Sequence, residues 1–106
     1  MDIFMALAEP TRRNIVELLA MKGELSASDI SDKFKVSSSA ISQHLKVLRE
    51  AEIVKMEKKA QMRIYAINPA AISQLEEWTK KLKDHWEGKF KNLEKLLAGE
   101  VNKNGR

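Results

Sequence analysis

The strongest constraint on the fold is a pair of helix-start signals that follow each other closely in the chain. Ser26 can accept a hydrogen bond from the amide of Asp29 and so cap one helix, and Ser37 can cap the next. Each cap is flanked by an apolar pair that can pack across it, Leu25 with Ile30 and Val36 with Ile41. The first helix is expected to end near Phe34, so the second begins after a tight connection. This spacing predicts a helix-turn-helix, although such pairs also occur in helical domains of other function.

Two further helices are expected before this pair. The first covers about residues 2–8, and the second begins with Pro10, whose missing N–H is unpaired at that position anyway. Gly23 is expected to end the second helix. The apolar residues of the two helices are Ile3, Phe4 and Leu7 in the first and Ile15, Leu18 and Leu19 in the second.

Residues 54–67 alternate in the manner of two short strands. Val54, Met56 and Ile64 are expected on one side, and Tyr65 and Ile67 on the other side of the second run. The strands are joined through Lys58, Lys59, Ala60 and Gln61. Because neither Ala60 nor Gln61 readily adopts a positive φ, a loop of four or more residues is expected. A helix-turn-helix followed by a hairpin with a basic tip is the winged arrangement.

A long helix is expected over about residues 69–98, started by Asn68 and Pro69 with Ile67 packing onto Ile72. Its apolar residues recur every three or four positions over about 26 residues, or roughly 39 Å. The small domain cannot cover such a stripe, so a second copy of the chain is the expected partner. The residues predicted at this dimer interface are Ile3, Phe4, Leu75, Trp78, Leu82, Trp86, Phe90 and Leu93.

The predicted fold is therefore mainly α with a small β-hairpin, in the order α-α-α-α-β-β-α. Residues 1–98 are expected to form a single domain, and residues 99–106, from Gly99 onward, a flexible polar tail. A chain of 106 residues with 43% hydrophobic residues is long enough for one core.

Composition excludes several classes of function. The chain has no cysteine, and no apolar run approaches the roughly 18 residues of a membrane span. Without a targeting signal at its start, a cytoplasmic location is expected. Two histidines, no Gly-rich phosphate loop and no paired carboxylates in an apolar setting leave nothing for catalysis, so the protein is not expected to be an enzyme. Residues 36–68 carry six basic and three acidic groups, which places +3 of the net charge of +4 there.

Three stretches resemble the ArsR-type bacterial winged-helix repressors: ALAEPTRRNIVELL, ELSASDIS and VSSSAISQHLKVLREAEIV. The resemblance covers residues 2–67 and implies a homodimer that represses transcription from a short two-fold symmetric operator, often in its own operon. The last helix is similar to that of a subgroup without metal sites. Metal-sensing members carry a Cys-x-Cys pair where this chain has Ser26 and Ser28, and His85 is the one imidazole available on the last helix. No metal and no cofactor are therefore expected.

The candidate DNA-binding surface comprises the helix over residues 37–51 and the wing over residues 58–63. On a helical wheel Ile41, Leu45 and Leu48 share one side, and polar residues occupy the other. The polar side is expected in the major groove, where Gln43 can pair with adenine and Lys46 with a phosphate. The wing is expected to contact phosphates or the minor groove. The predicted DNA-binding residues are Ser37, Ser38, Ser39, Ser42, Gln43, His44, Lys46, Lys58, Lys59, Gln61 and Arg63.

Some alternatives remain open in the sequence. His44 lies at the edge of the buried side, so it can be a structural histidine or a DNA contact. Arg12 and Arg13 can meet phosphate, or pair with Glu9 or Glu17. A winged helix can also be a protein-binding module without specific DNA binding, although the polar and basic face would be unusual in an apolar interface.

Overall fold

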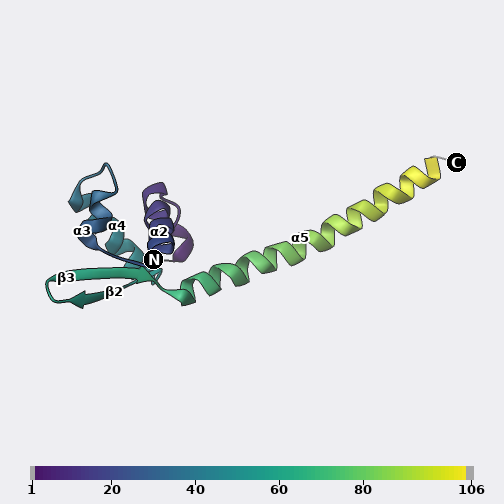
Figure 1. The fold of residues 1–106 in the computed structure, drawn as a ribbon. Coiled ribbons are helices and arrows are strands. Elements are labelled where there is room, and N and C mark those ends of the chain that lie inside the picture. Colours follow the sequence, from purple (N-terminus) through teal and green to yellow (C-terminus); the bar gives the residue numbers. More distant parts are fainter. Residues whose placement is uncertain (1, 105–106) are drawn as a thin grey trace. The chain divides into compact units, whose positions relative to one another are not determined.

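The structure, a computed structural model, describes residues 2–104 of the chain and the side chains of residues 2–99. The contacts divide the chain into a domain that extends to Ile72 and a helical segment from Ser73 onward. The elements are α1 (Ile3–Ala6), α2 (Pro10–Lys22), β1 (Glu24–Ser26), α3 (Ala27–Asp32), α4 (Ser38–Glu50), β2 (Val54–Lys59), β3 (Met62–Ile67) and α5 (Pro69–Asn104). Figure 1 shows them in chain order.

The two helix starts that define the helix-turn-helix are confirmed. The Ser26 hydroxyl accepts a hydrogen bond from the Asp29 amide at 3.1 Å, and the Ser37 hydroxyl accepts one from the Ala40 amide at 3.1 Å. Both serines have extended backbone, which is the conformation of a residue that precedes a helix. The turn between the helices begins slightly earlier than expected, because α3 ends at Asp32 rather than near Phe34.

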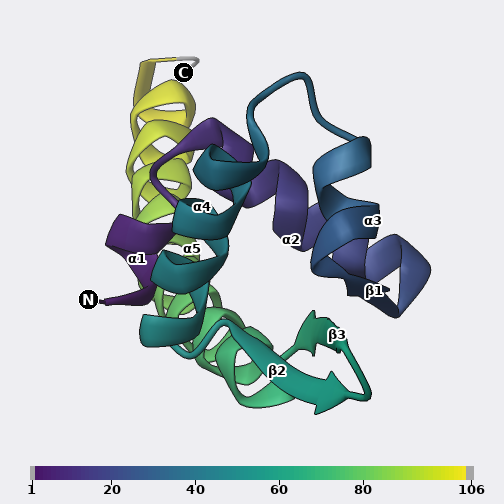
Figure 2. The ribbon, with the colours of Figure 1, turned by 90° about the vertical axis from the view of Figure 1, so that its left-hand side faces the viewer.

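The core of the domain lies between α2, α3, α4 and the sheet. Its fully buried large side chains are at most 1% exposed and are Ile15, Leu19, Ile30, Ile41, Leu45, Leu48 and Ile53. The three helices lie together on one side of the β2–β3 hairpin in both ribbon views (Figures 1 and 2). Full burial of one Leu or Ile contributes about 1.5–3 kcal/mol, so this cluster fixes how α4 is presented.

The sheet has three antiparallel strands in the order β1-β3-β2. The strand β1, which pairs Leu25 with Tyr65, was not predicted from the sequence. It has only three residues, and its partner strand lies about forty positions further along the chain, so no local sequence pattern predicts it. The mainly α fold with a hairpin is confirmed, with this strand added.

The hairpin differs from expectation in two ways. Lys59 pairs with Met62, which leaves Ala60 and Gln61 as a two-residue turn instead of the loop of four or more residues. Ala60 makes the tight turn possible by adopting a φ of 54°, a conformation that costs an alanine more than a glycine.

The second difference concerns the faces of the hairpin. Met56 lies opposite Tyr65, and Val54 lies opposite Ile67. Residues that are directly opposite in an antiparallel pair share a face, so these four lie together. Ile64 pairs with Glu57 on the other face, and the grouping of Ile64 with Val54 and Met56 was wrong.

The end of α4 is closed by a Schellman motif. The Ile53 amide donates to the Leu48 carbonyl at 3.0 Å, and the Glu52 amide donates to the Arg49 carbonyl at 2.9 Å. Glu52 occupies the left-handed position of the motif, with a φ of 59°. The Asn68 side chain then donates to the Glu52 carbonyl at 2.8 Å, which ties this corner to the residue preceding α5.

The helix α5 begins as expected but continues further. The Asn68 carboxamide oxygen accepts the Ala70 amide at 3.2 Å, and the helix runs through Gly99 to Asn104. Gly99 therefore does not end the helix. The flexibility expected of residues 99–106 stays a prediction, and residues 105 and 106 lie outside the described part. None of the described helices is long and apolar enough to cross a membrane.

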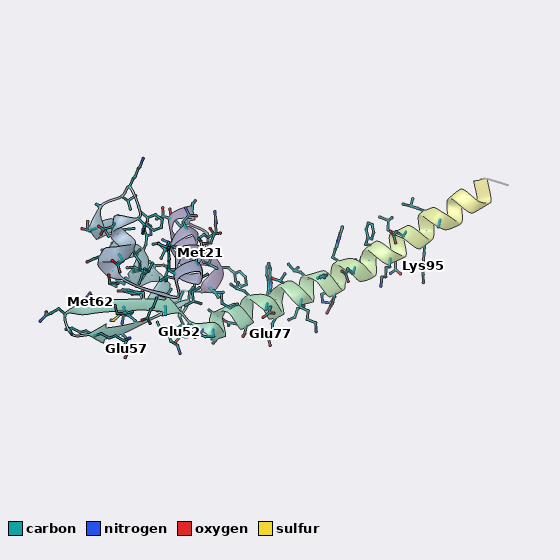
Figure 3. All side chains as sticks on the ribbon, viewed as in Figure 1. Met21, Glu52, Glu57, Met62, Glu77 and Lys95 are labelled. Carbon is teal, nitrogen blue, oxygen red and sulfur yellow. The ribbon has the colours of Figure 1, made fainter. Side chains whose placement is uncertain are left out.

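The large apolar residues of α5 beyond Leu75 are exposed. Figure 3 shows side chains projecting along the helix, with Glu77 and Lys95 labelled. Leu75 is half-buried, and the apolar residues that follow it every three or four positions are Trp78 (47% exposed), Leu82 (50%), Trp86 (68%), Phe90 (47%), Leu93 (51%) and Leu97 (53%), with Leu96 (69%) beside the last of them. We call these residues, from Leu75 to Leu97, the apolar stripe.

Candidate nucleic-acid interface

The helix α4 has one buried side and one exposed polar side. Ile41, Leu45 and Leu48 are at most 1% exposed. Most of the DNA-binding residues predicted on this helix are exposed, namely Ser37, Ser38, Ser39, Ser42, Gln43 and Lys46. The three serines at residues 37–39 surround the helix N-terminus, whose free N–H groups and positive dipole favour an anion. This polar side is available to a major groove.

The wing places its basic residues on two different faces. Lys58 lies opposite Arg63, and both therefore share the face of Met56 and Tyr65, which is turned toward the helices. Lys59 lies on the other face, which also holds Glu57 and which Figure 3 shows turned away from the helices. The Lys59 ammonium forms an ion pair with Glu24 at 3.7 Å. Of the predicted wing contacts, Lys58 and Arg63 thus lie on the side of α4, whereas Lys59 does not.

His44 faces the start of α2. Its Nδ1 lies 3.3 Å from Nη1 of Arg12 and 3.8 Å from a carboxylate oxygen of Glu9, and its side chain is 20% exposed. These contacts join α4 to α2 within the domain. They favour the structural alternative for His44 over a direct DNA contact.

Glu9 caps α2 and also meets His44. Partial desolvation raises the pKa of Glu9, but the hydrogen bond from the Arg12 amide, the positive charge that His44 can carry and hydrogen bonds from Thr11 outweigh it. The pKa of Glu9 therefore lies below its ordinary value. The N-terminus of α2 is thus held in place by an ionised carboxylate.

Arg12 and Arg13 bond to backbone carbonyls and form no ion pair with Glu9 or Glu17 among the described residues, whereas their contact with phosphate stays a prediction. Nε of Arg12 donates to the Ala6 carbonyl at 2.6 Å, and Nη1 of Arg13 donates to the Leu7 carbonyl at 2.9 Å. These carbonyls lie at the C-terminal end of α1, where a helix leaves its last acceptors unpaired. Both arginines thus fasten α1 to α2.

Ser26 and Ser28, which stand where metal-sensing members of the family carry a Cys-x-Cys pair, do not fit a soft-metal site. Ser26 is 7% exposed, and its hydroxyl is engaged as the cap of α3, whereas Ser28 is exposed. A hydroxyl cannot replace a thiolate as a ligand for a soft metal. Within the described residues, no group of three or more His, Cys, Asp or Glu side chains is arranged to hold a metal ion, and His85 is exposed on α5.

Arg49 is an exposed basic residue of this surface that the sequence analysis did not select. It lies on α4 three positions after Lys46, so the two side chains share a helix face. The spacing itself was visible in the sequence. The missing information was that β3 would lie beside this face and make the position part of a groove.

A helix-turn-helix with an exposed polar second helix, followed by a basic two-stranded wing, defines a winged helix-turn-helix DNA-binding domain. Residues 9–56, from the cap of α2 into β2, match the family described as bacterial regulatory protein, arsR family. The chain belongs to the ArsR family of transcriptional regulators.

Individual relatives agree with this assignment. The chain is 35% identical over 77 residues to the transcriptional repressor SdpR of Bacillus subtilis, and the alignment covers 73% of this chain and 84% of that protein. It is 41% identical over 70 residues to the HTH-type transcriptional regulator Rv2034 of Mycobacterium tuberculosis, and this alignment covers 66% of the chain and 64% of the relative. A crystal structure described as a possible transcriptional regulator for arsenical resistance superposes with a TM-score of 0.70 at 39% identity, and covers 77% of this chain and 84% of the other.

Proposed function

We propose that the chain is a homodimeric repressor that binds a short two-fold symmetric operator. Residues 37–51 enter the major groove, and the wing over residues 58–63 contacts the flanking backbone or minor groove. Two copies of α4 then reach half-sites about one helical turn, roughly 34 Å, apart. Repression follows if the occupied operator overlaps a promoter.

The observation that carries this proposal is the division of α4 into two sides. Its apolar side is fully buried, so the helix cannot turn, and its polar side presents Ser42, Gln43 and Lys46 to solvent. An amide such as Gln43 can bond bidentately to adenine, and hydroxyls bond base edges or phosphates. A protein-binding module would be expected to expose apolar residues here instead.

The exposed stripe on α5 supports a dimer. Leu82, Trp86 and Leu93 each expose half or more of their surface, and soluble proteins rarely leave so continuous an apolar surface uncovered. Of the two residues predicted from the first helix, Phe4 is 45% exposed, whereas Ile3 is only 7% exposed and leaves little surface for a partner. A symmetric pair of such helices is the simplest arrangement that covers the stripe.

No response to a soft metal is proposed, because Ser26 and Ser28 stand where thiolates would be needed. Some relatives are named for cadmium or arsenical resistance. The present chain lacks cysteine, so its release from DNA does not use that chemistry. The relatives that the chain resembles are named as transcriptional regulators.

The proposal is tested by footprinting the purified protein on the DNA upstream of its own gene. The experiment uses excess competitor DNA at two salt concentrations, because affinity depends steeply on salt. A protected, two-fold symmetric segment that survives competition is the expected result, and Gln43→Ala should reduce the discrimination against random duplex while keeping the fold. Equal binding to promoter and random duplex would overturn sequence-specific repression.

A further inference from the structure

A groove of about 330 Å³ lies between the C-terminal half of α4 and the strand β3. Its basic lining residues are Lys46 and Arg49 from α4 and Arg63 from β3, and Tyr65 also lines it. Ser42, Lys46 and Arg49 follow at intervals of four and three, so they form one row along the helix. The groove therefore begins beside Ser42 and Gln43, which are expected to contact bases, and continues along α4 toward Arg49.

The three cations around this groove have no ion-pair partner among the described residues, and Glu50, which lines a neighbouring hollow with Lys46 and Arg49, does not line the groove. No acidic residue lines the groove, and none of the three side chains makes an ion pair or hydrogen bond with another described residue. Lys59, on the other face of the same hairpin, does have a carboxylate partner. Like charges one helix turn apart repel each other, so an arrangement of three cations around one hollow is unfavourable until an anion enters it.

Tyr65 supplies an independent observation. The residue is only 4% exposed, yet its hydroxyl has no hydrogen-bond partner in the described part of the chain. No described buried side-chain oxygen lacks a partner, so the hydroxyl oxygen keeps some contact with solvent, and Tyr65 is one of the residues that line the groove. A tyrosine hydroxyl at a buried site normally finds a partner. An entering group with acceptor oxygens would provide one.

We propose that this groove binds one phosphoryl group, held by Arg49, Arg63 and Lys46 with the Tyr65 hydroxyl as a further donor. The group is a DNA backbone phosphate beside the major groove, because the row on α4 that lines the hollow continues into Ser42 beside Gln43. Arginine guanidinium groups match the oxygens of a phosphate in pairs. This assignment rests on the proposed function and adds Arg49 and Tyr65 to the DNA-binding residues.

The test compares Arg49→Gln with Lys55→Gln, because both remove one exposed positive charge. Lys55 lies on β2 opposite Ala66, on the face of the hairpin turned away from the groove. Binding of a fluorescent duplex of random sequence is measured by anisotropy over a series of salt concentrations. We expect Arg49→Gln to weaken binding on the order of tenfold and to reduce the slope of log affinity against log salt by about 0.9, the value for one phosphate contact. Lys55→Gln should change the slope by less than half of that amount.

Tyr65→Phe separates a binding role from a packing role. Since the hydroxyl has no partner within the described chain, its removal should leave the thermal midpoint unchanged and weaken duplex binding about threefold. A lowered midpoint with unchanged binding would overturn the role of Tyr65 in the groove.

Inorganic phosphate distinguishes the two sources of a phosphoryl group. At constant ionic strength, millimolar phosphate should displace no more duplex than chloride does. If phosphate displaces duplex from the wild-type chain and not from Arg49→Gln, the groove takes a free phosphorylated molecule and the backbone assignment is wrong. If the wild-type chain binds no duplex, the proposed function itself is wrong. If the wild type binds duplex but Arg49→Gln and Lys55→Gln change the affinity and the salt slope equally, only the phosphate site in the groove is wrong.

Discussion

Replacing Glu52 by glycine should stabilise the domain, although no contact is added. Glu52 holds the left-handed position of the Schellman motif that ends α4, with a φ of 59°. That conformation costs a residue with a Cβ about 1–2 kcal/mol, and the greater freedom of glycine in the unfolded chain offsets about 0.5–1 kcal/mol of the relief. The expected net gain in the free energy of unfolding is about 0.5–1 kcal/mol, or roughly 2–8 °C in the thermal midpoint.

The matched control is Glu52→Ala, which removes the same charged side chain but keeps the Cβ. Thermal unfolding of both variants is followed by circular dichroism at one protein concentration, because dimerisation would make the midpoint depend on concentration. The glycine variant should melt above the alanine variant. If the two melt together, or if alanine is the more stable, the strain assigned to this corner is absent.

Four further predictions concern the DNA-binding surface, the stripe and the cap of α2. Gln43→Ala should relax base preference at one position of each half-site at a cost of about 1–3 kcal/mol, seen in competition against single-base operator variants. Lys58→Ala should weaken binding to all duplexes alike and flatten the salt dependence. Lys59→Ala should have a smaller effect, because Lys59 lies on the other face of the hairpin and pairs with Glu24. An equal effect of the two variants would contradict the assignment of faces. Trp86→Glu should place a charge in the apolar stripe and yield monomers in sedimentation, together with loss of operator binding. Glu9→Gln should lower stability at neutral pH, and the difference from wild type should vanish as the pH falls through the depressed pKa of Glu9, since a carboxylate with a lowered pKa stabilises the fold only while ionised.

The sequence was most informative where structure is set by neighbours in the chain. The caps at Ser26 and Ser37 and the start at Pro10 depend on residues three or four positions away, and all three are confirmed. The burial of one side of α4 follows from the helical spacing of Ile41, Leu45 and Leu48, which can be read from the thirteen residues of the helix alone.

Features that depend on distant partners could not be predicted in the same way. The strand β1 exists because β3 offers it an edge, and the face of Tyr65 is fixed by pairing with Met56 across the hairpin. The positive φ angles at Glu52 and Ala60 could not be predicted from the sequence, because glycine is the residue expected at such positions. In the site, the exposure of Gln43 and Lys46 was predictable from the wheel, whereas the groove beside Arg49 requires the sheet and α4 together.

The two-residue turn also governs how the wing can change in length. Because side chains alternate along β2 and β3, inserting one residue into each strand would bring Lys59 to the helix side and turn Lys58 away. Inserting two residues into each strand would keep every side chain on its face and extend the hairpin by about 6–7 Å. Natural variation in wing reach among such proteins should therefore come in steps of two residues per strand, and a homologue with an odd step would need a bulge to restore its basic face.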